Sequence, residues 1–254
     1  MDLSSTDVTL SVRFYRELFG WEAVFDPRPE SGGYGRFTLD GKVVAGIGPG
    51  LGDGVPSVWN TYVATGDAEA TASAVRAAGG GVELEPARAF GEGVVTAFQD
   101  PSGAFLMAWQ AGRPAATITG ITGSTGIRDA VGPGRPAWSE LVTREAGVGE
   151  AFYRAVFDWS LKDDGLPGAP YARWHLHGRP VAGAVRPEAS LPPDTPSHWR
   201  ACFAVGDAAA AVERVRDLGG AVLVPPAPTP AGRRAVVADP QFAVFGLIEP
   251  GGAP

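Results

Sequence analysis

Residues 14–21 read FYRELFGW, and residues 152–159 read FYRAVFDW. Other stretches recur at nearly the same separation: Trp59 to Asp67 as Trp199 to Asp207, Val75-Arg76 as Val215-Arg216, and Asp100-Pro101 as Asp239-Pro240. The separations of these four pairs are 138, 140, 140 and 139 residues, and such self-similarity indicates an internal duplication. The sequence therefore predicts two similar domains, residues 1–112 and 136–254, joined by a Gly/Thr/Pro-rich linker over residues 113–135.

The composition limits the class of protein. The chain has 254 residues, of which 44% are hydrophobic, which is enough for two ordinary cores. Its net charge of -7 argues against nucleic-acid binding, which depends on clustered Lys and Arg. The sequence has no apolar run of about 20 residues, no secretory signal pattern, and a single cysteine, Cys202. These features predict a cytoplasmic protein without a nucleic-acid or membrane partner.

Each half divides into two modules with the same order of elements. The first module is expected to contain a strand, a helix and three strands, over residues 3–8, 12–19, 22–25, 35–39 and 43–46. After a Gly/Pro-rich segment the order repeats over residues 58–65, a helix between Asp67 and Gly79-Gly80, and residues 82–85, 94–99 and 105–109. The sequence therefore predicts an α+β fold of four βαβββ modules, arranged as two similar half-barrel domains.

Two motifs mark the modules: the aromatic stretch at residues 14–21 and the turn Asp100-Pro101-Ser102-Gly103. With four βαβββ modules in this order, the chain resembles the vicinal oxygen chelate superfamily of glyoxalases, bleomycin-resistance proteins and extradiol dioxygenases. The resemblance implies that each pair of modules encloses a small-molecule cavity. The turn of the second half differs, because it reads Asp239-Pro240-Gln241-Phe242. Gly at the fourth position is favoured but not required, so this turn is expected to form.

Most members of this superfamily hold a divalent metal with His and carboxylate ligands. In the first half, the first ligand position implied by the motif spacing would precede Met1. The remaining positions hold Trp138, Asn60, Arg200, Met107 and Gly246. A first-row divalent ion needs several imidazole or carboxylate donors, and an arginine has no acceptor. We therefore expect no metal and no other cofactor in either half.

The three histidines do not form a repeated set. His175 and His177 are expected to alternate on one strand and to point to the same face, from which they could chelate a metal in principle. The simpler explanation is a polar, partly exposed strand that makes surface or ligand contacts. His198 follows Pro196-Ser197 and is expected to be a loop residue.

Strand alternation predicts which side chains face the cavities. For the first half these are Asp2, Asn60, Tyr62, Ala64, Phe105, Met107 and Trp109. For the second half they are Trp138, Glu140, Val142, Arg200, Cys202, Ala204, Val244, Gly246 and Ile248. The ligand-binding candidates among them are Asn60, Tyr62, Phe105, Met107, Trp109, Trp138, Glu140 and Arg200. Apolar walls with a few polar groups are typical of small-molecule sites, although the same aromatic residues could simply fill the core.

Glu140 is the first candidate for acid/base chemistry, and His175 is the second. An acid in an apolar barrel can have a raised pKa and can then act as a general acid or base. A structural ion pair with Arg200 would instead keep Glu140 ionised and unreactive. Asp2 is a weaker candidate, because the end of a chain tends to fray.

Three classes of function follow from these residues. The first is a metal-independent protein that binds a hydrophobic, aromatic, polyketide-like molecule in secondary metabolism or antibiotic resistance, as similar actinobacterial two-domain proteins suggest. The second is a metal-independent enzyme of natural-product biosynthesis that uses Glu140 or a histidine. The third, a metal enzyme, is disfavoured by the ligand positions. The partner is expected to be a small molecule, and the chain a monomer or weak homodimer.

Overall fold

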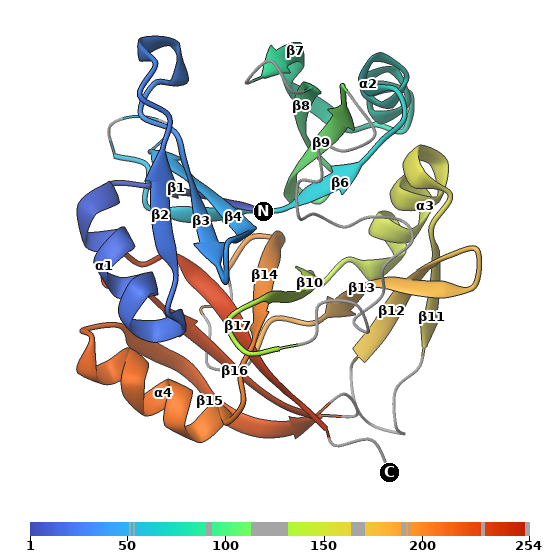
Figure 1. Ribbon diagram of the computed structural model, residues 1–254. Helices are drawn as coiled ribbons and strands as arrows, with labels where there is room; N and C mark the ends of the chain where they lie inside the picture. Colours follow the sequence, from blue (N-terminus) through green and yellow to red (C-terminus); the bar gives the residue numbers. More distant parts are fainter. Residues whose placement is uncertain are drawn as a thin grey trace. The chain divides into compact units, whose positions relative to one another are not determined.

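The computed structural model describes residues 1–50, 52, 54–89, 93–112, 132–163, 171–188, 192, 194–229 and 232–251. Most of the predicted linker, residues 113–131, lies outside the described residues. The described chain is a mixed α+β fold, in which the order strand, helix, three strands occurs four times (Figure 1). The predicted fold class is therefore confirmed.

The first half contains two of these modules. The first module consists of β1 (Asp2–Ser5), α1 (Val8–Phe19), β2 (Glu22–Phe25), a 3-10 turn η1 (Pro29–Ser31), β3 (Gly35–Leu39) and β4 (Lys42–Pro49). The second consists of β5 (Val58–Asn60), β6 (Tyr62–Ala64), α2 (Ala68–Ala77), β7 (Gly81–Ala89), β8 (Gly93–Gln99) and β9 (Phe105–Ala111).

The second half contains the other two. The third module consists of β10 (Pro136–Val142), α3 (Ala146–Phe157), β11 (Ser160–Asp163), β12 (Tyr171–Leu176) and β13 (Arg179–Val185). The fourth consists of β14 (His198–Ala204), α4 (Ala208–Asp217), β15 (Ala221–Thr229), β16 (Gly232–Ala238) and β17 (Val244–Pro250). No helix in the described part of the chain is long and apolar enough to cross a membrane.

The structure differs from the predicted boundaries at the start of α1, where a helix cap is responsible, and at Thr61, where a predicted strand is divided. The strand predicted over residues 3–8 is too long, because the Asp7 side chain accepts a hydrogen bond from the Leu10 amide and starts α1 at Val8. Gly20, with φ +75°, ends the same helix. Asp67 caps α2 through the Ala70 amide, as predicted. The single strand predicted over residues 58–65 is divided at Thr61 into β5 and β6.

The chain forms two compact units that do not coincide with its two halves. The first unit consists of Met1–Asn60, Ile127–Ala137 and Arg200–Pro254, and the second of Thr61–Gly126 and Trp138–Trp199. The first unit therefore combines the first and fourth modules, and the second unit combines the second and third. The sequence predicted the modules but not this combination.

In every module the first strand pairs in parallel with the last. The first unit contains the strand orders β2-β3-β4-β1-β5 and β14-β17-β16-β15, with β1 parallel to β4 and β14 parallel to β17. The second unit contains β6-β9-β8-β7 and β11-β12-β13-β10, with β6 parallel to β9 and β10 parallel to β13. The helix of each module is the connection that a parallel pair requires.

The aromatic motif builds the core of each unit. In the first unit Tyr15 is fully buried, stacks on Trp21 at a ring distance of 5.6 Å, and packs against Phe245 of the fourth module at 5.8 Å. In the second unit Tyr153 stacks on Trp159 at 5.7 Å. Burying each such ring contributes about 1.5–3 kcal/mol to folding. The aromatic stretch repeated at residues 14–21 and 152–159 is therefore a packing motif.

The two buried tyrosines also connect the repeated motifs by hydrogen bonds. In the second unit Trp199 Nε1 donates to Tyr153 Oη at 2.8 Å, and Tyr153 Oη donates to Asp100 Oδ2 at 2.8 Å. The first unit repeats this chain, since Trp59 donates to Tyr15 at 2.9 Å and Tyr15 donates to Asp239 at 3.1 Å. Burial raises the pKa of both tyrosines well above the ordinary value, and raises the pKa of Asp239.

The aspartates at the ends of these chains also hold the Asp-Pro turns. Asp239 Oδ1 accepts from the amides of Gln241 and Ala243, each at 2.9 Å. The Phe242 amide donates to the Asp239 carbonyl at 2.9 Å, so the turn of the second half forms as predicted. Phe242 takes the left-handed conformation, with φ +66°, that Gly103 occupies in the first half.

Candidate functional site

Each sheet has one face that packs into the hydrophobic core and an opposite face that does not. On β9, Leu106 and Ala108 are fully buried in the core of the second unit, so Phe105, Met107 and Trp109 lie on the other face. We call the sheet face that does not pack on a helix the open face. The predicted alternation agrees with this arrangement, while a ligand-binding role for the open-face residues stays a prediction.

The open face of the third module carries a compact group of side chains above Gly183. Trp138 Nε1 donates to Tyr171 Oη at 2.9 Å, and Glu140 is paired with Gly183 in the strand register. A Cβ atom added to Gly183 would lie 2.7 Å from Tyr171 Oη, 2.9 Å from Trp138 Nε1 and 3.2 Å from Glu140 Cγ. Only glycine lets these side chains lie against the backbone of β13. We call Trp138, Glu140, Tyr171 and Gly183 the Glu140 array.

The acid and the indole of this array are almost completely shielded from solvent, whereas Tyr171 is half-buried. Glu140 is 1% exposed and Trp138 is 5% exposed. Arg173 of β12 is paired with Gly183 on the side opposite to Glu140, so Glu140, Gly183 and Arg173 are neighbours across three strands. The arrangement places an acid, a phenol and an indole on one spot of the sheet, where hydrogen bonds to a bound molecule would be little weakened by water.

The first module contains the same arrangement above Gly46. Tyr34 Oη donates to Asp2 Oδ2 at 3.2 Å, and Asp2 pairs with Gly46 on one side and with Asn60 on the other. A Cβ atom on Gly46 would lie 1.9 Å from Tyr34 Oη and 2.8 Å from Asp2 Cβ. Asn60 Nδ2 donates to Asp2 Oδ1 at 2.8 Å. The expectation that Asp2 frays is wrong, because β1 is paired on both sides and Asp2 is 7% exposed.

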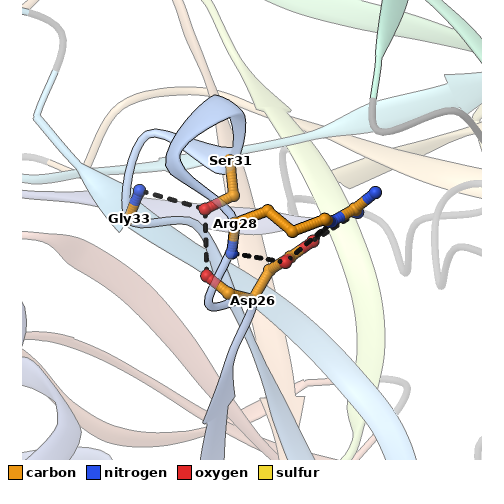
Figure 2. A network of polar contacts seen from close by, with 4 residues as sticks. All are labelled: Asp26, Arg28, Ser31 and Gly33. Carbon is orange, nitrogen blue, oxygen red and sulfur yellow. Dashed lines mark hydrogen bonds and ion pairs between the residues drawn. The ribbon is translucent and has the colours of Figure 1, made fainter.

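A fixed loop between β2 and β3 presents Tyr34. Figure 2 shows its core: Asp26 accepts hydrogen bonds from the Arg28 amide and side chain, and its carbonyl accepts from Ser31 Oγ at 3.0 Å. Ser31 Oγ in turn accepts from the Gly33 amide at 3.3 Å. Hydrogen bonds from Arg28 lower the pKa of Asp26 to about 2. The loop closes where the Asp26 amide donates to the Tyr34 carbonyl at 3.1 Å, which holds the Tyr34 backbone beside the end of β2.

Reasoning from alternation alone missed Tyr34, Tyr171 and the two glycines. A repeat signal for them exists, since residues 44–46 and 181–183 both read Val-Ala-Gly. Tyr34 and Tyr171 have the same separation of 137 residues, as do Arg36 and Arg173. These positions could have been found by extending the repeat comparison to the third and fourth strands of each module.

The second module contributes an aromatic group. Tyr62 is paired with Met107 in the strand register and is 8% exposed. Trp109 is 5% exposed and lies over Gly93, whose added Cβ would come within 2.5 Å of the indole. Among the described residues, the Trp109 Nε1 atom has no hydrogen-bond partner. Phe105 is half-buried on the same face.

The fourth module carries a buried arginine and a buried cysteine on its open face. Arg200 is 1% exposed, and Cys202 lies over Gly246, where an added Cβ would be 2.5 Å from the sulfur. Glu140 and Arg200 belong to different compact units, and the ion pair expected between them stays a prediction. The structure thus groups Glu140 with Trp138, and Asn60 with Asp2.

The histidines differ from their predicted placement. His177 has φ +50° and lies in the turn after β12, so it does not alternate with His175 on a strand. His175 follows an irregularity in the pairing of β12 with β13, is 7% exposed, and contacts the Arg173 carbonyl through Nδ1 at 3.0 Å. His198 is the first residue of β14 rather than a loop residue.

The residues at the superfamily's metal positions do not fit a divalent ion. Trp138 presents an indole N–H that donates to Tyr171, and Arg200 is a cation. The Asn60 amide nitrogen is directed at Asp2, and Gly246 has no side chain. Among the described residues no group of three or more His, Cys, Asp or Glu side chains could hold a metal ion. The donor set is therefore wrong for such a site.

Four βαβββ modules in this order are the architecture of a glyoxalase-type protein. The family model described as "Glyoxalase/Bleomycin resistance protein/Dioxygenase superfamily" matches residues 1–107 and 126–243. The chain belongs to this superfamily and has two glyoxalase-like domains along its sequence.

Relatives of known name cover almost the entire chain. It is 39% identical to the anthracycline biosynthesis protein DauV of Streptomyces sp. (strain C5), over 98% of this chain and 91% of that protein. It is 36% identical to the putative glyoxylase CFP32 of Mycobacterium tuberculosis, over 98% and 93%. The crystal structure of the Mn(II)-bound glyoxalase from Novosphingobium aromaticivorans shares the fold, with a TM-score of 0.61 at 15% identity over 97% and 79% of the two chains.

Proposed function

We propose that the protein binds a planar, hydrophobic aromatic small molecule at the open faces of its sheets, and that it does so without a metal ion. The observation that carries this proposal is the Glu140 array, in which Trp138 and Tyr171 lie against Gly183 beside a buried acid. Rigid aromatic rings next to a few convergent polar groups are the usual composition of a small-molecule site.

Aromatic stacking supports the choice of a planar ligand. Stacked or edge-to-face rings contribute about 0.5–1.5 kcal/mol beyond the burial of their area. The open faces offer Trp138 and Tyr171 in the third module, and Tyr62 and Trp109 in the second. A polycyclic ligand could use several such contacts, while Glu140 and Tyr171 could orient its hydroxyl or carbonyl oxygens.

The relatives support a role in secondary metabolism. DauV and its Streptomyces peucetius counterpart DnrV, each 39% identical to this chain, carry the name "anthracycline biosynthesis protein". An aromatic polyketide-like ligand in a cytoplasmic biosynthetic or resistance pathway is therefore our proposal for this protein. Metal independence is supported by the identity of Trp138, Asn60, Arg200 and Gly246 at the ligand positions.

Isothermal titration calorimetry with 2-hydroxyanthraquinone as the probe tests the binding proposal. We expect Trp138→Ala to weaken binding at the Glu140 array about tenfold or more, and Gly183→Ala to weaken it by pushing Tyr171 and Trp138 away from β13. The matched control is Gly147→Ala, because a Cβ atom at Gly147 of α3 meets nothing within 4 Å. Failure of the probe and of related polycyclic quinones to bind the wild-type protein would contradict the proposal. Unchanged binding by Gly183→Ala would contradict the role of the array.

A second function is favoured by the burial of Glu140 beside a tyrosine hydroxyl. Such a pair could move a proton from a carbon next to a carbonyl group of a bound ligand to another position of the same ligand, an isomerisation that needs no metal and no co-reactant. Under this reading Glu140→Gln lowers conversion by roughly 10²–10⁴ while binding persists. Conversion of each binding quinone would be followed by liquid chromatography and mass spectrometry, with exposed Glu69→Gln as the control. If the protein only binds, no conversion is seen in either protein and the affinity changes modestly.

A further inference from the structure

The first unit holds a hydrogen-bonded group that differs in chemistry from the Glu140 array. We call Asp2, Ser4, Tyr34 and Asn60 the Asp2 network. Asn60 Nδ2 donates to both Asp2 Oδ1 and Ser4 Oγ, at 2.8 and 2.9 Å, and Tyr34 donates to the other Asp2 oxygen at 3.2 Å. Asp2, Ser4 and Asn60 are each at most 8% exposed, and Tyr34 is half-buried.

One acceptor in this network is left over. Among the described residues, Asn60 Oδ1 has no hydrogen-bond partner although it is buried. The orientation of the Asn60 amide follows from chemistry, because the Asp2 carboxylate accepts and must face the NH₂ group. A buried carbonyl oxygen without a donor is unfavourable and rare in folded proteins. The network therefore lacks a hydrogen-bond donor.

Movement of the Tyr34 side chain would give a ligand access to the Asp2 network. Tyr34 is the most exposed member of the network, and its hydroxyl end lies against Gly46 without any side chain beneath it. Rotation of this one side chain would uncover the Asp2 oxygen that its hydroxyl contacts, next to Asn60, while leaving the strand pairing of β1 intact. The loop that carries Tyr34 is fixed through Asp26, so the ring can return to the same place.

We infer that the Asp2 network is a second ligand-binding site in the first unit, and that it selects ligands carrying a free hydroxyl group, which donates to Asn60 Oδ1. The inference rests on the proposed function and adds a site with its own specificity. In the Glu140 array the Trp138 indole can only donate, and it already donates to Tyr171. In the Asp2 network the neutral Asn60 Oδ1 is an acceptor without a partner among the described residues. A phenol and its methyl ether are therefore distinguished by the first unit.

Calorimetry on the full chain can isolate this site. The Trp138→Ala variant weakens the Glu140 array about tenfold or more, so the tighter binding that remains is assigned to the first unit. We expect 2-hydroxyanthraquinone to show this tighter binding in the variant, and 2-methoxyanthraquinone to show it about tenfold more weakly, because the ether cannot donate. Adding Asn60→Leu should remove the difference between the two probes. Asn60→Ala, which removes the acceptor without adding bulk, serves if Asn60→Leu fails to fold, as judged by circular dichroism.

The outcomes separate the two proposals. Complete loss of probe binding in Trp138→Ala, with binding in the wild type, overturns the second site and leaves the proposed function standing. Equal affinity for the two probes in Trp138→Ala, or a preference for the phenol that survives both Asn60 substitutions, also overturns the assignment to Asn60. Binding of neither probe to the wild type overturns both proposals.

Discussion

Removing one buried hydroxyl should destabilise the second unit substantially. In the variant Tyr153→Phe the ring stays in the core, but Trp199 Nε1 loses its acceptor at 2.8 Å and Asp100 Oδ2 loses its donor at 2.8 Å. Trp199 is 6% exposed and Asp100 is 3% exposed, so water cannot readily replace either partner. Each unsatisfied buried group costs roughly 1–3 kcal/mol, so with two such groups the unfolding free energy should fall by about 2–6 kcal/mol.

Urea denaturation followed by tryptophan fluorescence measures this loss, and thermal unfolding should show a midpoint lowered by about 5–15 °C. The matched variant Tyr15→Phe in the first unit should behave alike, since Tyr15 bridges Trp59 and Asp239 at 2.9 and 3.1 Å. A double-mutant cycle of Tyr153→Phe with Asp100→Asn should give a coupling energy of about 1 kcal/mol or more. A loss below about 0.5 kcal/mol, the level of an ordinary surface substitution, would refute the reasoning.

Three further predictions concern single residues. Burial raises the pKa of Asp239, so the folded state binds the proton of this carboxyl group more tightly than the unfolded state does. The stabilisation from this group therefore falls as the pH rises from about 3.8. Urea titrations at several pH values should show that the stability difference between wild type and Asp239→Asn shrinks over that range. Phe242→Gly should stabilise the protein by about 1 kcal/mol, because Phe242 is 72% exposed and has φ +66°; a lower melting temperature would contradict this. Asp67→Ala should cost about 1 kcal/mol by removing the cap of α2, whereas exposed Glu69→Ala should cost little.

The repeated motifs were sufficient to predict the modules because each motif acts locally. Asp67 caps the helix that immediately follows it, and Gly20 ends the helix that precedes it. The alternation of β9 likewise places Met107 and Trp109 opposite to Leu106, since neighbouring side chains on a strand point to opposite faces. Errors arose where a local competitor was overlooked, as when Asp7 starts α1 at Val8 instead of letting the strand continue.

The open-face groups were only half predicted from the sequence. Glu140, Trp138 and Asn60 follow from alternation. Tyr171 reaches the same open-face position from the start of β12, and Tyr34 does so from the residue just before β3. Their positions depend on the strand register, and on glycines 46 and 183, which leave room for a ring against the backbone. Register is set by pairing between strands that lie far apart in the sequence, so alternation along one strand cannot reveal it.

The sequence by itself determined that the chain consists of four βαβββ modules. It also determined which residues begin and end their helices, and which faces of their strands are apolar. Only the tertiary structure decided that Tyr153 meets Asp100 and that Tyr15 meets Asp239, so that the first module packs with the fourth and the second with the third. The physical reason is that duplicated modules carry nearly the same apolar surfaces and the same Trp, Tyr and Asp. Local patterns cannot distinguish such equivalent partners, and the choice between them is made by long-range packing and buried hydrogen bonds.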